Sequence, residues 1–197
     1  HVNLGDYVCF DDRIVEFGNG YLKAKAIDDR AGCYILCELL KKDLEFDTWF
    51  CFCSQEEVGL RGAQIAAYKI EPDIALVVEA TTCSDVHGAK EHEYVTRLNG
   101  GAAITFMDRT TIVSRDYSNW LYELGKKNGI NVQYKTLVAG GNDAGIIHKT
   151  KGGIKTASVS VPCRYIHSPA SIASKEDIKA VLELAGCFLD NVSQMLK

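Results

Sequence analysis

The chain has 197 residues, of which 47% are hydrophobic and 24% are charged, and its formal net charge is -4. A chain of this length can bury a sizeable core without disulfides, which excludes a disulfide-stapled miniprotein. The mildly acidic balance and the lack of a basic run argue against a nucleic-acid partner, and no apolar stretch is long enough to cross a bilayer.

The eight cysteines do not form a metal-binding or disulfide framework, because none belongs to a CxxC pair. Cys33 and Cys37 lie in an apolar helical pattern, and Cys51 and Cys53 alternate with phenylalanines in a strand-like run. These are positions of small buried hydrophobic residues. We therefore expect free thiols and a reducing, cytoplasmic compartment.

Strand-like and helix-like patterns alternate along the first half of the chain. A Gly-Asp turn precedes a short predicted strand at residues 7–10, and a helix is expected from the Asp28-Asp29 pair to residue 42. A buried strand at residues 47–54 is followed by a helix at residues 63–69. After Pro72, the apolar run at residues 74–80 predicts a second buried strand.

The second half continues this alternation and ends in a long helix that begins at Ser174. Ser174 and Asp177 have the spacing of a capping box, with Asp in place of the usual Glu or Gln. The pattern predicts a three-layer α/β sandwich, in which a mixed, mostly parallel sheet has helices on both faces and residues 1–197 form one domain. The remaining expected strands are 102–106, 131–137 and 155–161, and the remaining expected helices are 116–128 and 143–149.

Four short segments concentrate acidic residues or histidine near the ends of predicted strands or the starts of helices. For any one of them alone, a solvated turn is the favoured interpretation. In an α/β sheet, however, strand ends can bring distant segments together, and a bound cation would offset the repulsion between their carboxylates. Carboxylate and imidazole ligands suit zinc, cobalt or manganese. The segments are AIDDRAG (26–32), SQEEVGLRG (54–62), VVEATTCSD (77–85) and RYIHSP (164–169).

In order and spacing, these motifs resemble those of the glutamyl and deblocking aminopeptidases, a family of tetrahedral dinuclear metallopeptidases often labelled cellulase M or endoglucanase. The resemblance covers nearly the whole chain, including the GDYV and GNG turns and the VAGGNDAG loop. It implies the phosphorylase/hydrolase-like fold of a metallopeptidase catalytic domain. The implied activity is removal of N-terminal residues from peptides.

The resemblance also implies two divalent ions, zinc or cobalt with manganese as an alternative. Asp28 would bridge both ions, Glu57 and His167 would complete one site, and Glu79 would hold the other ion. Many relatives have Asp at the position of Glu79. Asp29, after an expected cis peptide bond, would orient its neighbours, although a plain helix-capping role fits it equally well.

In the same resemblance, Glu56 would be the general base that takes a proton from the metal-activated water and returns it to the leaving amine. The loop residues Gly140, Gly141, Asn142 and Asp143 resemble an active-site wall, where Thr is commoner than Asn. A turn followed by a helix cap explains this loop equally well. His87 is a further candidate for the substrate pocket.

One expected ligand is absent from the sequence: the family's first metal-binding histidine precedes an inserted PDZ-like domain, and the chain resembles the part after that insertion. We therefore expect an N-terminally truncated catalytic domain and a weakened second metal site. In place of the family's dimers and dodecamers, we expect a monomer or a poorly defined oligomer. An exposed sheet edge is also expected. The alternatives are an inactive or partly active fragment and a glycoside hydrolase, which would need paired carboxylates beside a sugar.

Overall fold

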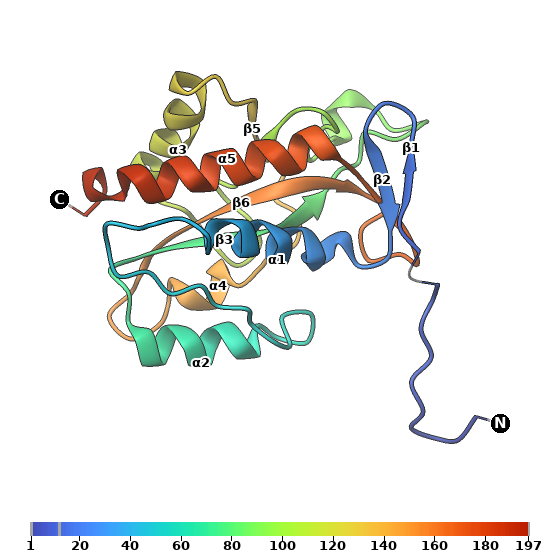
Figure 1. Cartoon of the computed structure of the whole chain (residues 1–197), viewed down its shortest axis with the longest axis horizontal. Helices are drawn as coiled ribbons and strands as arrows, with labels where there is room; N and C mark the ends of the chain where they lie inside the picture. Colours follow the sequence, from blue (N-terminus) through green and yellow to red (C-terminus); the bar gives the residue numbers. More distant parts are fainter. Residues whose placement is uncertain (1, 12, 197) are drawn as a thin grey trace.

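The computed structural model describes residues 2–11 and 13–196. Figure 1 shows helices on both faces of a twisted sheet, with the first residues extending away as a tail. The strands are β1 Val15–Phe17, β2 Tyr21–Ala24, β3 Ile74–Thr82, β4 Ala102–Ile104, β5 Val132–Tyr134, β6 Lys155–Arg164 and β7 Ser171–Ser174. The helices are α1 Ile27–Leu39, α2 Arg61–Ile70, α3 Arg115–Lys127, α4 Ala144–Ile147 and α5 Lys175–Asn191, with short 3₁₀ turns η1 Glu91–Glu93 and η2 Val192–Gln194.

All seven strands belong to one mixed sheet, which confirms the expected α/β class. Its order is β1-β2-β7-β6-β4-β5, and β3 pairs with the other edge of β6. The pairs β3–β6 and β4–β5 are parallel, whereas β1–β2, β2–β7, β4–β6 and β6–β7 are antiparallel. Parallel pairing is less prevalent than expected, because β4 pairs with β6 in the antiparallel sense and because β1, β2 and β7 were not predicted.

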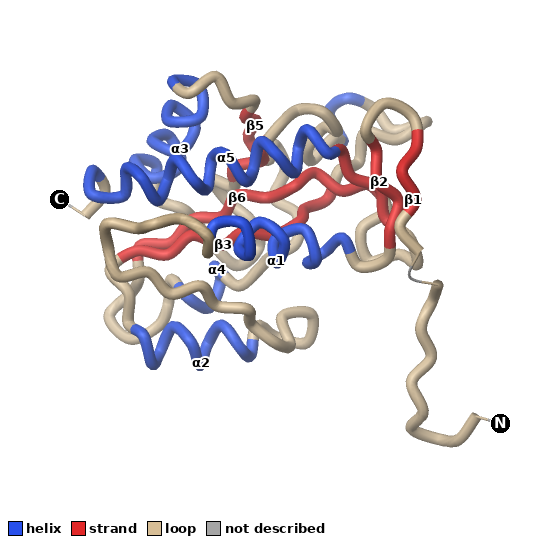
Figure 2. Tube along the Cα trace, in the orientation of Figure 1, coloured by secondary structure: helices blue, strands red, loops and turns tan. Residues whose placement is uncertain are grey.

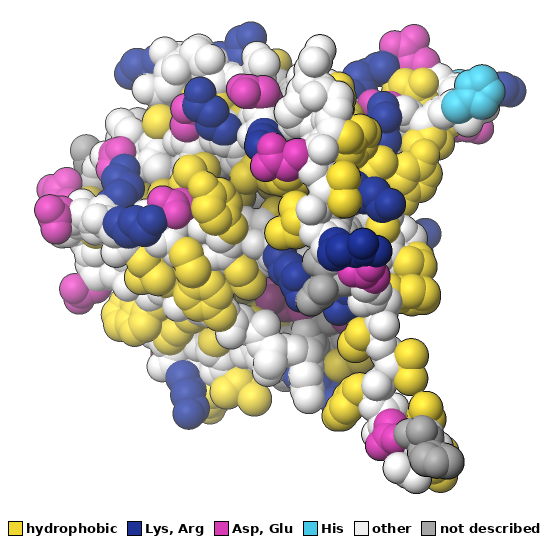
Figure 3. Space-filling view, turned by 45° about the vertical axis from the view of Figure 1, so that its right-hand side comes forward, with side chains coloured by type: hydrophobic (Ala, Val, Ile, Leu, Met, Phe, Trp, Pro, Cys, Tyr) yellow, Lys and Arg dark blue, Asp and Glu magenta, His cyan; other side chains and the backbone are white. Residues whose placement is uncertain are grey.

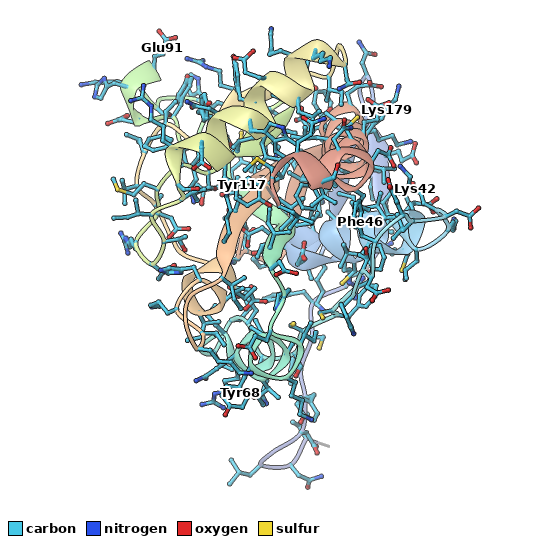
Figure 4. All side chains as sticks on the ribbon, turned by 90° about the vertical axis from the view of Figure 1, so that its left-hand side faces the viewer. Lys42, Phe46, Tyr68, Glu91, Tyr117 and Lys179 are labelled. Atoms are coloured by element: carbon cyan, nitrogen blue, oxygen red, sulfur yellow. The ribbon has the colours of Figure 1, made fainter. Side chains whose placement is uncertain are left out.

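Two groups of helices enclose the sheet. Helices α1, α3 and α5 pack together over one face, and α4 lies against β3 and β6 with α2 beside it. Tyr117 of α3, labelled in Figure 4, is fully buried, and its hydroxyl donates to the Ala75 carbonyl of β3. Its ring stacks on Phe188 of α5 at a centroid distance of 6.2 Å. Burial of such aromatic surface anchors α3 and α5 together.

The start of α5 is capped differently from the expected capping box. Ser174 Oγ accepts a hydrogen bond from the Glu176 backbone N–H, as an N-cap side chain should. Asp177 instead turns to a distant loop, where its two oxygens accept the backbone N–H groups of Asn99 and Gly101 at 2.7 and 2.8 Å. The reciprocal bond to the N-cap was a wrong prediction, because Asp177 is satisfied by tertiary contacts.

Two predicted strands do not form. Residues 7–10 lie in the exposed N-terminal tail, which has no neighbouring strand to supply hydrogen bonds. Residues 47–54 form part of the long loop between α1 and α2 (Figure 2). A β-strand requires a neighbouring strand to pair with, so an apolar, β-branched or aromatic run is not sufficient to form one.

All eight cysteines are free, as expected. The expected burial of four of them was wrong, because Cys33, Cys37 and Cys51 are exposed and Cys53 is only half-buried. Within the described residues, no helix combines the length and apolar character that a membrane-crossing segment requires.

Candidate active site and metal centre

The candidate site is assembled from segments that lie far apart in the sequence. Asp28 stands at the start of α1, Glu57 in the loop before α2, and His167 in the turn between β6 and β7. One potential ligand atom from each of these three residues lies within 4.8 Å of the other two. The fold therefore brings together side chains separated by up to 139 positions.

Within this cluster, His167 contacts both carboxylates. Its Nε2 atom lies 3.0 Å from Asp28 Oδ2 and 3.5 Å from Glu57 Oε2. The side chains of His167 and Glu57 are 61% and 59% exposed, whereas that of Asp28 is 17% exposed. The cluster is thus open on one side, so a cation or a peptide could reach it from solvent.

The acidic groups around this cluster hold their protons more strongly than usual. Burial and the nearby Glu57 carboxylate raise the pKa of Asp28. Desolvation, with added repulsion from Asp28 and Glu56, raises the pKa of Asp29 to about 8. The pKa of Glu56 rises to about 7, mainly through desolvation and then through Asp143 and Glu57. Mutual repulsion of this kind favours a bound cation.

Glu79 approaches the same region from β3. Its Oε1 accepts hydrogen bonds from Asn142 Nδ2 at 2.6 Å and from Ser160 Oγ at 3.3 Å. Burial raises its pKa well above the usual value, and the charges of Asp28 and Asp29 add to this shift. Glu79 is therefore near the cluster, although the three-residue group with mutually close ligand atoms does not include it.

The backbone around the cluster has unusual conformations. The Asp28–Asp29 peptide bond is cis, as the resemblance implied. Ala26, Gln55 and His167 have φ values of 51°, 62° and 60°, in the left-handed region that non-glycine residues rarely adopt. Such strained residues concentrate at functional sites, which supports a functional role for this corner of the fold.

The glycine-rich loop before α4 closes one side of the site. Gly141 lies so near Thr110 that a Cβ atom would come within 2.6 Å of its side chain, and Gly140 has φ = 63°. The next residue, Asn142, is buried, and it links this loop to Glu79. One buried carboxylate oxygen of Asp143 has no hydrogen-bond partner in the described part of the chain, and its charge acts on Glu56.

His87 and Asp85 have different surroundings. His87 is exposed in the loop after β3, so its role as a pocket residue stays a prediction. Asp85 Oδ1 accepts a 2.6 Å hydrogen bond from Arg164 Nε, and Asp85 Oδ2 accepts one from the Leu98 backbone N–H. Asp85 therefore connects β6 to the loop around Leu98.

Two residues near Glu79 were missed in the sequence. Ser160 faces Glu79 directly in the β3–β6 register, and Lys135 is almost fully buried with Glu79 and Asp108 as its nearby acidic groups. Burial lowers the pKa of Lys135, while these two carboxylates oppose that shift. No sequence signal marks either residue, because both depend on strand pairing.

The donor set fits a divalent cation. Asp28, Glu57 and His167 offer two carboxylate oxygens and one imidazole nitrogen within reach of a common point. Zinc is typically bound by such nitrogen and oxygen ligands, and three protein ligands leave a position open for reactants. Asp28 and Glu79 could contribute to a second position with fewer ligands.

Comparison with known proteins gives the same assignment. The family model for M42 glutamyl aminopeptidases matches residues 1–184. This chain belongs to that family. A relative in Acetivibrio thermocellus is 40% identical over 185 residues, which cover 93% of this chain and 55% of the relative. The glutamyl aminopeptidase of Lactococcus lactis is 32% identical over 178 residues, covering 88% of this chain and 49% of that enzyme.

Solved structures of M42-type peptidases have the same fold. An aminopeptidase from the archaeon Desulfurococcus kamchatkensis superposes with a TM-score of 0.89 at 34% identity, covering 92% of this chain and 52% of that one. A Pyrococcus horikoshii peptidase that can assemble into a tetrahedron or a large octahedral shell gives a TM-score of 0.79 at 28% identity, with 91% and 53% covered. The chain thus spans about half the length of these relatives.

Proposed function

We propose that this M42 family chain forms the catalytic part of a metal-dependent aminopeptidase that removes N-terminal residues from peptides. The observation that carries the proposal is the convergence of Asp28, Glu57 and His167, whose ligand atoms lie within 4.8 Å of one another. Membership of an aminopeptidase family supports it further.

In this proposal the chain holds two divalent ions unequally. Asp28, Glu57 and His167 would bind one ion, and Asp28 with Glu79 would bind the other less tightly because that pair offers fewer ligands. Zinc, cobalt or manganese fits these donors. A divalent cation supplies Lewis acidity to a peptidase site when bound.

The chain's own side chains would handle the proton and the substrate. Glu56, adjacent to Glu57, would take a proton from the attacking water and return it to the departing amine nitrogen. Asp29 would keep the start of α1 in place through its 2.8 Å hydrogen bond with the Gly32 backbone N–H. Gly140, Gly141, Asn142, Asp143 and His87 would form the walls against which the peptide lies.

The proposal also includes the cellular compartment and the oligomeric state. Free thiols on all eight cysteines are consistent with a reducing compartment such as the cytoplasm. A polypeptide of the relatives' full length would form a closed homo-oligomer, as the Pyrococcus horikoshii peptidase can.

An activity assay with two substrate classes tests the proposal. Aminoacyl-nitroanilides and carboxymethylcellulose are supplied to the purified chain with zinc, cobalt or manganese, and then with a chelator. We expect hydrolysis of the nitroanilides only, and loss of that activity with the chelator. Cellulose cleavage that resists the chelator would contradict the proposal and favour a glycoside hydrolase.

A non-catalytic fragment is the remaining alternative, because the chain spans about half the length of its relatives. Metal binding without turnover of any nitroanilide would favour it. A glycosidase is less well supported, since it requires a carboxylate pair flanking a sugar, whereas here the carboxylates gather around a histidine.

A further inference from the structure

Lys135 is the one lysine or arginine that is buried in the described part of the chain, with only 4% of its surface exposed. On the face of the molecule drawn in Figure 3, by contrast, Lys and Arg side chains project from the surface. Burial of an ammonium group is costly unless a negative charge or a hydrogen bond compensates it. A buried lysine therefore indicates that its charge acts on a group nearby.

Lys135 lies on the same face of the sheet as Glu79. It follows β5 directly, and its backbone N–H donates to the Ile104 carbonyl of β4 at 3.0 Å. Side chains alternate along a strand, and the residues beside these two positions pack into the core on the other face. These core residues are Tyr134 of β5, Ile104 of β4, Val159 and Val161 of β6, and Val78 and Ala80 of β3. Lys135 and Glu79 therefore both point away from that core, to the face where α4 packs.

The residues that lie between them on this face have small side chains. Ser160 pairs with Glu79 in the β3–β6 register and with Ala103 in the β4–β6 register. Two residues along, the Thr105 backbone N–H donates to the Ser158 carbonyl. Neighbouring strands are about 4.8 Å apart, so β5 and β3 are separated by roughly 15 Å. The long lysine and glutamate side chains can shorten that gap from both ends, because no bulky side chain stands between them.

The charge of Lys135 is not taken up by the nearest loop. Asp108 Oδ1 accepts the backbone N–H groups of Thr110 and Thr111, and Asp108 Oδ2 is buried without a hydrogen-bond partner in the described part of the chain. Burial lowers the pKa of Lys135, and the carboxylates of Glu79 and Asp108 oppose that shift. Burial raises the pKa of Glu79, and Lys135 opposes that rise in turn. The ammonium group therefore acts on Glu79 through space.

A divalent ion held by Asp28 and Glu79 would be repelled by this ammonium group. Like charges in a protein interior are screened less than in water, so the repulsion extends over several ångströms. Glu79 Oε1 already accepts hydrogen bonds from Asn142 and Ser160, which leaves its other oxygen for an ion. The first ion position, at the three-residue cluster, lies on the open side of the site, where solvent screens charge better. Lys135 should therefore weaken the second position much more than the first.

We propose that Lys135 limits the chain to one tightly bound divalent ion, because its buried ammonium group opposes a second ion at Asp28 and Glu79. The inference rests on the proposed metal-dependent function and names a residue that regulates how many ions the site holds. The alternative is a purely structural role, in which Lys135 only offsets the buried charge of Asp108. Its removal would then change the thermal midpoint but not the affinity for the second ion.

Calorimetric titration with zinc, with the bound zinc counted by atomic emission, tests this without any measurement of activity. Lys135→Met replaces the ammonium group with an apolar side chain of similar length. The variant should bind the second zinc at least about tenfold more tightly than the wild type, and the first within about threefold. Lys149→Met removes the same charge from an exposed position, where solvent screens it, so it should change neither affinity.

A second substitution in the Lys135→Met background locates the additional ion. Glu79→Gln removes a carboxylate oxygen and should cancel the gain in affinity for the second zinc. Circular dichroism shows whether each variant is folded. If Lys135→Met does not fold, Lys135→Gln provides the same comparison with a neutral polar side chain.

Three results would overturn the proposal: equal affinity of the wild type and Lys135→Met for the second zinc, an equal gain in Lys149→Met, or a gain that persists with Glu79→Gln. Failure of the proposed function would look different. The wild type would then bind no zinc at the three-residue cluster, and His167→Ala would leave its titration unchanged, which would overturn both proposals.

Discussion

Glu56 and Glu57 are neighbours in the sequence but have different surroundings. Glu57 is exposed and lies 3.5 Å from His167, whereas Glu56 is half-buried and feels the charge of Asp143. Glu56 begins the turn before α2, where its carbonyl oxygen accepts the backbone N–H groups of Gly59 and Leu60. Replacement of Glu56 should therefore affect mainly turnover, whereas replacement of Glu57 should affect mainly metal affinity.

Replacement of Glu56 by Gln should lower turnover of aminoacyl-nitroanilides by roughly 10²- to 10⁴-fold, because a positioned proton acceptor is lost. Metal affinity, measured by calorimetric titration, should change by no more than a few-fold. The matched variant Glu57→Gln should instead lose metal affinity. Normal turnover in Glu56→Gln would show that this residue is not the base.

Asn142 should be important for stability as well as for the shape of the site. Its side chain donates to Glu79 at 2.6 Å and accepts the Ala144 backbone N–H at 2.9 Å. Asn142→Ala leaves both groups short of a partner, so the free energy of unfolding should fall by about 1–3 kcal/mol in urea titration. The exposed residue Asn119 serves as a control, and Asn119→Ala should change the free energy of unfolding by less than about 0.5 kcal/mol. Equal effects would contradict the structural role of Asn142.

The sequence predicted which residues form the cluster, but it did not predict which residues contact Glu79. Each acidic or histidine segment alone is typical of a solvated turn, and the four stand out because they share a position near strand ends or helix starts. The Asn142–Glu79 bond spans 63 positions, and the Ser160–Glu79 contact depends on the register of β3 against β6. Neither contact produces a pattern in the local sequence, so only the three-dimensional structure identifies the neighbours of Glu79.

Among the elements, helices were predicted more accurately than strands. Helix α3 begins and ends within one residue of its expected limits, because its hydrogen bonds and apolar stripe are local. Residues 47–54 have equally strong strand character, but none of the described residues pairs with them as a strand. The short strands β1, β2 and β7 escaped prediction because pairing, more than composition, defines them.

The start of α5 gives a pH-dependent prediction. Burial raises the pKa of Asp177 to about 6, above the ordinary value of 3.8 that applies in the unfolded chain. Between these values the folded state binds the extra proton, so stability falls as pH rises across this window, by about 2–3 kcal/mol from this group alone. Chemical unfolding of the wild type and of Asp177→Asn at pH 4 and pH 6.5 measures the difference.

In Asp177→Asn this part of the pH dependence should disappear, because the amide does not titrate. The variant still presents one oxygen to the Asn99 or Gly101 N–H group, so it should fold. An unchanged slope between pH 4 and pH 6.5 would show that Asp177 does not titrate in this range.

At the scale of the whole molecule, the candidate site is a concentration of like charge at one end of the sheet. Asp28, Asp29, Glu56 and Glu79 all have raised pKa values, and each of these shifts includes repulsion from another acidic group. Their repulsion opposes folding at neutral pH, so a bound cation should stabilise the fold.

Zinc or manganese at about 100 times its dissociation constant should therefore raise the thermal midpoint by roughly 5 to 10 °C, corresponding to about 3 kcal/mol. The chelator should reverse the shift. His167→Ala should abolish most of it, whereas His92→Ala, in the η1 turn, should leave it intact. An equal shift in both variants would mean that the cation binds elsewhere.

The most direct test of the central claim is an anomalous difference map from a crystal of this chain grown with zinc. The account predicts one strong peak between the carboxylates of Asp28 and Glu57 and the imidazole of His167, with a weaker peak or none between Asp28 and Glu79. A map with no peak at the three-residue cluster, or with zinc bound only at other surface groups, would contradict it.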